Sequence, residues 1–158
     1  MSELIVALEK TDGEHRQALD WFLRNTGRAI PWVRIEAQGA IGFRLATRVK
    51  GIYKPHYTQY ALSVRQTLDG PYADKRVGRR RDGSWVYPYF QENSDPAQRD
   101  KAATNRGLLR CRADGVPVGV LLQIKLKPRS EYIVLGLALV REWNAGYFIL
   151  EGYADNPG

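Results

Sequence analysis

The segment from Gly70 to Glu92, GPYADKRVGRRRDGSWVYPYFQE, combines two kinds of side chain that bind nucleic acid. Basic residues lie in its middle, and aromatic residues precede and follow them. Aromatic rings stack on nucleobases, and Lys and Arg neutralise phosphates without distinguishing sequence. Asp74 adds a carboxylate that can accept a hydrogen bond from the amino group of cytosine, which thymine lacks. The segment predicts a site for an unstacked cytosine, with a plain turn role for Asp74 as the alternative.

The positive charge of the chain is concentrated in one region. The 158 residues carry a formal net charge of +7. Between Arg44 and Arg81 there are ten basic and two acidic residues, whereas the rest of the chain has 14 basic and 15 acidic residues. Segregated charge creates a local positive potential that attracts a polyanion. The charge favours nucleic acid as the partner; solvated faces of strands and loops are the alternative.

Few residues could carry independent catalysis. His15 and His56 lie in no catalytic or metal-ligand spacing, the acidic residues form no specific motif, and DGVPVGV lacks the spacing and the Lys of a phosphate-binding loop. The single cysteine, Cys111, cannot form an internal disulfide and is expected to be a small buried residue. We therefore expect no enzymatic activity in this chain, no cofactor and no metal.

Length and hydropathy fit a single domain over residues 1–158. With 44% hydrophobic and 26% charged residues, the chain has the composition of a soluble globular protein. Its apolar runs are all shorter than the roughly 20 residues that span a bilayer. The start, MSELIVALEKTDGEHR, has no basic region before its short apolar stretch, unlike a secretory signal. We expect a cytoplasmic location and no membrane partner.

The pattern of apolar residues predicts one N-terminal helix followed by strands. A helix is expected at about 12–26, capped by Asp12 or Thr11, with Ala18, Trp21 and Phe22 on its apolar face. A short helix is expected near 104–110. Short strands bounded by Gly, Pro and Asp are expected at AIPWVRI, FRLATRV, YALSVRQT, WVYPYFQ, VPVGVLLQIKL, EYIVLGLALVREW and GYFILEGY. The predicted fold is mainly β with one or two helices (α+β), in a strongly curved sheet or open barrel.

Seven segments resemble, in their order along the chain, the SET- and RING-associated (SRA) domain. They are GIYKP, YALSVRQT, GPYAD, YPYFQE, AATNRGLLRC, GVPVGVLLQ and GYFILEGY, over about residues 51–153. The resemblance implies an SRA-like (PUA-like) domain that binds double-stranded DNA containing modified cytosine by flipping the base out of the duplex. The modification that it favours is 5-methylcytosine. Similar bacterial members are the recognition half of restriction endonucleases that cleave with an HNH domain. It therefore implies a C-terminal HNH nuclease domain as a partner in a longer bacterial protein.

The resemblance also implies roles for individual residues. Tyr72 matches the first stacking tyrosine and Asp74 the acid that bonds the base edge; Tyr89 matches the second stacking tyrosine, with Tyr87 as its rival. Residues 91–101 lie near the family's second DNA-contacting loop. In the family, one loop enters the gap that the flipped base leaves in the duplex. The residues that correspond to this loop here are His56, Tyr57, Thr58 and Gln59. The charge pattern adds as expected DNA contacts Lys75, Arg76, Arg79, Arg80 and Arg81. Arg106, at the expected helix start in AATNRGLL, is expected to reach a phosphate.

Departures from the family pattern leave the preferred modification open. DGP replaces the family's glycine pair, and EYIVLGLALV replaces its Tyr-Asp-Gly strand. An RNA-binding module of PUA-like architecture and a small enzyme acting on a nucleotide remain the alternative hypotheses.

Overall fold

Eight strands and four helices make up the described part of the chain. The computed structural model describes residues 3–36, 44–47, 51–68, 77–91 and 102–153. The helices are α1 (Glu3–Leu8), α2 (Gly13–Arg24), α3 (Trp32–Glu36) and α4 (Ala103–Asp114). The strands are β1 (Ala29–Pro31), β2 (Ile52–Tyr53), β3 (Ser63–Gln66), β4 (Gly78–Arg79), β5 (Trp85–Phe90), β6 (Val118–Lys125), β7 (Glu131–Asn144) and β8 (Tyr147–Gly152).

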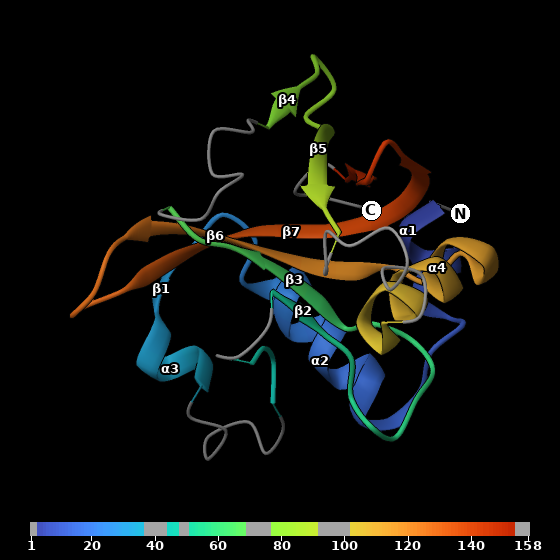
Figure 1. Cartoon of the computed structure of the whole chain (residues 1–158), viewed down its shortest axis with the longest axis horizontal. Helices are drawn as coiled ribbons and strands as arrows, with labels where there is room; N and C mark the ends of the chain where they lie inside the picture. The colour runs from blue at the N-terminus through green and yellow to red at the C-terminus, as the bar shows by residue number, and fades with distance from the viewer. Residues whose placement is uncertain (1–2, 37–43, 48–50, 69–76, 92–101, 154–158) are drawn as a thin grey trace.

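All the strands belong to one mixed sheet (Figure 1). Their order is β2-β3-β6-β7-β8-β5-β4, and β1 pairs with the start of β7. The pairing of β3 with β6 is parallel; the other pairings are antiparallel. The register between β6 and β7 shifts near Gly136. The φ of this residue is 131°, a conformation that glycine adopts more easily than other residues. Such irregularities bend a strand, and the mainly β fold with a curved sheet is confirmed.

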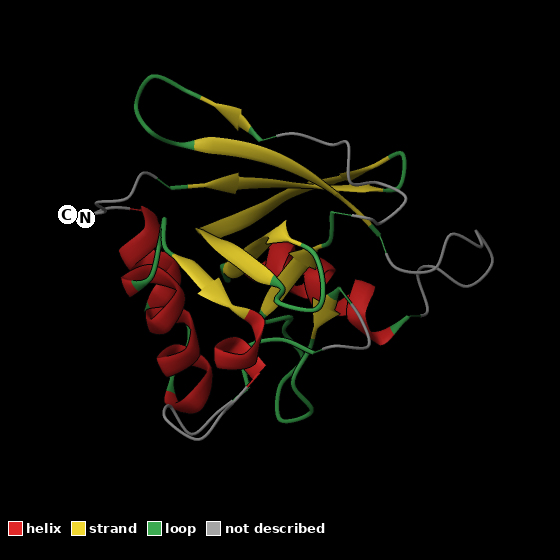
Figure 2. Ribbon diagram, turned by 90° about the vertical axis from the view of Figure 1, so that its left-hand side faces the viewer, coloured by secondary structure: helices red, strands yellow, loops and turns green. Residues whose placement is uncertain are grey.

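The central strands are buried on both faces. One face packs on the N-terminal helices, as Figure 2 shows, in a cluster that we call the helical core. The other face packs on α4 and on β5 and β8, in a cluster that we call the inner core. Adjacent residues of β6 divide between them, since Val120 belongs to the inner core and Leu121 to the helical core. Because successive side chains of a strand point to opposite faces, such strands carry nearly continuous apolar runs.

Strand β5 carries the most regular alternation in the chain. Trp85, Tyr87 and Tyr89 are buried in the inner core, and the residues between them are only partly buried. Pro88 lacks a backbone N–H, and it is tolerated because β4 pairs only with Trp85 and Val86 and leaves that edge of Pro88 unpaired. The alternation fixes which face of β5 points inward.

Tyr89, on the strand next to one end of the strand order, closes the curved sheet by reaching to the other end. Its hydroxyl lies against Gly51, the residue before β2, although β2 and β5 are far apart in that order. A side chain on Gly51 would overlap this hydroxyl. Glycine is therefore required here for close approach, and the sheet curls into a partly closed barrel.

Several expected elements differ from the observed ones. The helix over 12–26 is α2, but His15 and Leu19 join Ala18 and Phe22 on its buried face, and Trp21 is only partly buried. The strand AIPWVRI ends at Pro31, because the helical turn of α3 places Trp32 and Ile35 on the helical core together. Residues 44–47 of FRLATRV form no strand, since their carbonyls accept hydrogen bonds from the side chains of Ser63 and Arg65.

The shortest elements of the structure were not predicted from the sequence. Strands β2 and β4 have two residues each, too few to show alternation, and α1 was not expected. Helix α4 is longer than the helix expected at 104–110, and its N-cap is Ala102, so that Thr104 and Asn105 are buried helical residues. In the described part of the chain, no helix has the length and apolar character needed to cross a membrane.

We predict that Gly51→Ala lowers the free energy of unfolding. The new methyl group would overlap the Tyr89 hydroxyl and lie 3.0 Å from the carbonyl oxygen of Arg65. Overpacking of this kind costs about 1–3 kcal/mol. Tyr89→Phe removes the hydroxyl and should recover part of the loss in the double variant. Gly78→Ala is the control, because the nearest atom to its Cβ is 3.7 Å away.

Urea unfolding of these variants measures the effect. A Gly51→Ala protein as stable as wild type, or a double variant with no recovery, would show that Tyr89 does not close the sheet at Gly51.

Candidate nucleic-acid interface

The residues predicted to contact nucleic acid fall into three described places and one segment outside the description. Tyr72, Asp74, Lys75 and Arg76 belong to residues 69–76, which lie outside the described residues, as do 92–101 of the second expected loop. The other predicted residues lie in the inner core, in a groove beside α4 and the hollow that adjoins it, and at the β4–β5 hairpin. The predicted residues that the structure describes thus come from several elements of the fold.

Tyr87 and Tyr89 point into the interior of the curved sheet. Their relative exposures are 1% and 5%, so neither presents an open ring face at the surface. Burial raises the pKa of Tyr87 to about 12, and its hydroxyl therefore stays protonated at neutral pH. This hydroxyl is buried and has no hydrogen-bond partner in the described structure. Buried polar groups normally have partners, so the Tyr87 hydroxyl marks a place where a polar group could bind.

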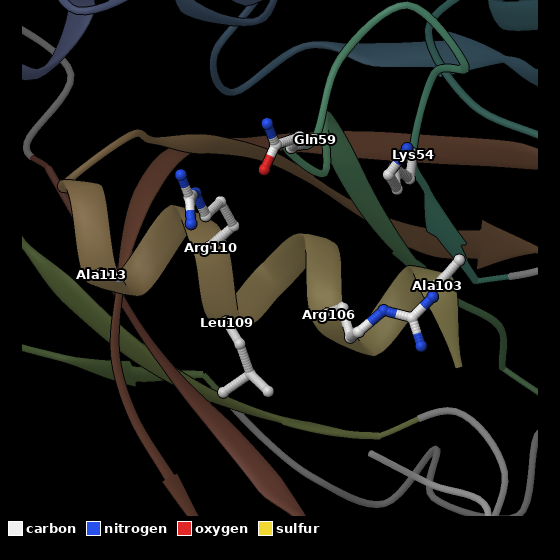
Figure 3. A pocket seen from close by; sticks show the side chains of 7 residues that line it. All are labelled: Lys54, Gln59, Ala103, Arg106, Leu109, Arg110 and Ala113. Atoms are coloured by element: carbon white, nitrogen blue, oxygen red, sulfur yellow. The ribbon is translucent and has the colours of Figure 1, made fainter. Parts of the chain in front are cut away.

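The second place is a groove between the segment after β2 and helix α4 (Figure 3). It has a volume of about 440 Å³. Three of its lining residues are basic, one is an amide and three are apolar: Lys54, Arg106, Arg110, Gln59, Ala103, Leu109 and Ala113. The structure therefore brings together Gln59 and Arg106, which are far apart in sequence and were both predicted to contact DNA.

The groove forms because α4 and the segment after β2 approach closely. Gly107 of α4 faces Ala61 and the side chain of Lys54: a Cβ at Gly107 would lie 3.0 Å from the Ala61 nitrogen and 3.3 Å from Lys54 Cδ. The side chain of Cys111 also points toward Ala61, with 3.4 Å between Sγ and the carbonyl oxygen. Burial raises the pKa of this thiol to about 12, which agrees with the expected inert role for Cys111.

A second hollow, of about 490 Å³, adjoins the groove. The loop predicted to contact DNA supplies most of its lining: Lys54, His56, Tyr57, Thr58, Gln59 and Tyr60. Tyr57 is 45% exposed, yet its hydroxyl lies 3.3 Å from Nδ1 of His15 on α2. Burial lowers the pKa of His15 to about 4, so the imidazole is neutral at pH 7 and can accept this hydrogen bond. Helix α2 thus holds the exposed Tyr57 ring in place.

The third place is the β4–β5 hairpin, where Arg79, Arg80 and Arg81 are exposed. They do not behave alike. Arg80 forms an ion pair of 2.5 Å with Glu151 of β8, and this hydrogen bond lowers the pKa of the Glu151 carboxyl. Glu151 also pairs with Arg141, which in turn pairs with Glu3 of α1, both at 2.7 Å. Arg80 therefore has a structural partner, whereas Arg79 and Arg81 are exposed beside it.

Lys54 and Arg110 are groove residues that the sequence prediction did not assign. Lys54 was counted only as part of the basic region, although it directly precedes a proline and the predicted loop. Arg110 lies one helical turn after Arg106, an i, i+4 spacing that places both on neighbouring positions of a helix surface. That spacing was a usable signal. Within the described residues, no group of three or more His, Cys, Asp or Glu side chains is placed to hold a metal ion.

Comparison with known proteins gives structural but no sequence matches. No protein-family model and no curated protein sequence matches the chain. The chain is similar to KRYPTONITE in a complex with mCHG DNA and SAH, with 15% identity, 97% of this chain and 40% of that chain covered, and a TM-score of 0.49. It is also similar to the SUVH5 SRA domain in a complex with hemi-methylated CG DNA, with 22% identity, 77% and 81% coverage, and a TM-score of 0.46. At these values the likeness alone assigns no function.

We predict that His15 makes stability depend on pH. Its pKa falls from 6.5 in the unfolded chain to about 4 in the native state, so between these pH values the unfolded state binds the extra proton. Stability should be unaffected by His15 above pH 6.5 and fall as the pH drops toward 4, by at most about 3 kcal/mol at about 1.4 kcal/mol per pKa unit.

Urea unfolding between pH 7 and 4.5 checks this expectation. His15→Gln should lose this part of the pH dependence, and the control His56→Gln, at an exposed position, should retain it. Equal slopes for wild type and His15→Gln would contradict a buried neutral His15.

We predict unequal roles for the hairpin arginines. Replacing Arg79 and Arg81 by Gln should weaken the binding of modified and unmodified duplexes alike, and should reduce the slope of log K against log salt by up to about 2. Arg80→Gln should change the slope less, because Glu151 already pairs with Arg80. Titrations at four salt concentrations measure the slopes; a larger loss for Arg80→Gln than for the double variant would assign the phosphate contact to Arg80.

Proposed function

We propose that this chain is an SRA-like domain that binds DNA containing modified cytosine, and that the modified base is 5-methylcytosine. The flipped base enters the interior of the curved sheet. The structures compared above are complexes with methylated DNA, and the proposal gives this chain the same class of ligand. The observation that carries it is the buried Tyr87 hydroxyl, which lacks a described partner beside the ring of Tyr89. An extruded base needs both ring surfaces and hydrogen-bonding groups.

The position of Val77 supports a role for Tyr72 and Asp74 in the same pocket. Val77 is the first described residue after the segment 69–76, and it packs against the inner core that contains Tyr87 and Tyr89. We propose that Tyr72 stacks on the base and that Asp74 accepts its amino hydrogen.

The basic groove and the arginine hairpin support DNA as the partner. Both carry exposed cations on elements that adjoin the inner core, since α4 supplies Leu108 and β5 supplies Tyr89 to it. Cations around a pocket hold the phosphates, while the pocket selects the base. We propose that the domain recognises DNA and that a separate HNH nuclease domain of a longer protein cleaves it.

The test is a comparison of affinity for modified and unmodified duplexes. Tyr72→Ala should reduce the preference for modified DNA by roughly ten- to a hundredfold, since a base stack contributes about 1–3 kcal/mol. Asp74→Asn should also reduce it, because the amide can turn a donor toward the cytosine amino group. Tyr87→Phe removes only a hydroxyl and should cost about two- to tenfold. Tyr89→Ala is unsuitable, because truncating a buried aromatic ring costs about 3–5 kcal/mol of stability.

The control is Tyr153→Phe, which removes another buried hydroxyl, on a residue that packs against the helical core. It should leave the preference unchanged. A 2-aminopurine signal beside the modified cytosine reports whether the base leaves the duplex. Preference for RNA of the same sequence would support the PUA-like RNA-binding alternative, and an unchanged preference in all three variants would refute the proposed pocket.

A further inference from the structure

The groove beside α4 combines cations from two distant parts of the chain. Lys54 follows β2, while Arg106 and Arg110 lie on successive turns of α4. Figure 3 shows Lys54 and Gln59 on one side of α4, with the guanidinium of Arg110 turned toward Gln59. None of the described residues that line it carries a carboxylate. A hollow whose described lining combines cations and an amide is suited to an anion.

Asp114 holds the side chain of Arg110 in position. Its Nε lies 3.3 Å from Oδ2 of Asp114, and the same oxygen accepts a hydrogen bond of 2.6 Å from the Tyr60 hydroxyl. This hydrogen bond raises the pKa of Tyr60, which therefore remains a donor at neutral pH. The backbone carbonyl of Asp114 accepts in turn from Lys10 Nζ at 3.1 Å. Asp114 pairs with Arg110 and orients its guanidinium, and Lys54 adds a second cation to the groove.

The shape of the site favours a polymer over a small anion. The groove of about 440 Å³ and the adjoining hollow of about 490 Å³ share Lys54 and Gln59 in their linings, so together they form one trough. The half-exposed Tyr57 ring lies along it. The apolar lining contributed by Leu109 can contact a sugar, and the cations can contact a phosphate. A trough with this sequence of groups fits the backbone of a nucleic-acid strand.

We propose that Lys54 and Arg110, with the side-chain amide of Gln59, hold one backbone phosphate of the bound nucleic acid. The inference rests on the proposed function, which it deepens by assigning a phosphate site distinct from the base pocket. This site fixes the position of the strand on α4, and its contribution to affinity does not depend on the modification of the base. It should therefore contribute equally to the binding of modified and unmodified duplexes.

The first experiment replaces both cations of the proposed phosphate site, in the full chain. Lys54→Gln combined with Arg110→Gln should weaken both duplexes by about tenfold and reduce the salt slope by about 1, as expected for one phosphate. The matched control is Arg129→Gln, which removes an exposed cation on the β6–β7 hairpin, outside the groove. Its thermal unfolding midpoint and that of the double variant are measured in parallel.

The second experiment identifies the phosphate itself. A series of duplexes carries a single neutral methylphosphonate at successive positions. Wild type should lose about tenfold in affinity at one position, and the double variant should lose nothing further there. Additive losses at every position, or a double variant that binds like Arg129→Gln, would overturn the phosphate site.

The outcomes separate this inference from the proposed function. If wild type prefers modified DNA and the double variant retains both affinity and salt slope, the phosphate site is wrong and the function stands. If wild type shows no preference for modified DNA but the methylphosphonate cycle is non-additive, the phosphate site stands and the proposed function is wrong.

Discussion

The contact between the Tyr89 hydroxyl and Gly51 determines the shape on which the rest of the structure depends. It joins two strands that are distant in the sheet order, and the sheet must curl for them to meet. Curling creates the interior into which Tyr87 points, and it places β2 near α4, where Lys54 meets Gly107. The buried interior and the basic groove are thus two consequences of one closure. A flat sheet with the same residues would have neither.

Much of the fold was predictable because its signals are local. The alternation in β5, the apolar runs of β6 and β7 and the amphipathic pattern of α2 each lie within one stretch of sequence, although Asp12 at the N-cap of α2 makes no side-chain capping hydrogen bond. What failed depends on partners elsewhere. AIPWVRI alternates like a strand, but β1 pairs with β7 over only three residues, and packing of Trp32 and Ile35 then favours a helix. Likewise, nothing near Lys54 in the sequence indicates that Arg110 lines the same groove.

The candidate site shows the same limit in its electrostatics. The basic residues between Arg44 and Arg81 suggested one positive surface, but the fold gives them different roles. Arg65 lies over the rings of Trp32 and Tyr132, 5.1 and 5.8 Å from their centroids, and Arg80 pairs with Glu151. Lys54 instead joins the cations of α4. Charge density along a sequence thus indicated the class of partner, while the fold decides which cations remain available to it.

The helical core has a consequence for how the chain folds during synthesis. The apolar faces of α1 and α2 are covered by Leu121, Val134 and Leu137, which follow them by about a hundred residues. Until β6 and β7 have left the ribosome, the N-terminal helices lack the strands that complete their core, and β1 has no partner strand. Such long sequence separations slow folding. The N-terminal third should therefore remain open to proteases and chaperones until nearly the whole chain has been made, and any early termination would leave it exposed.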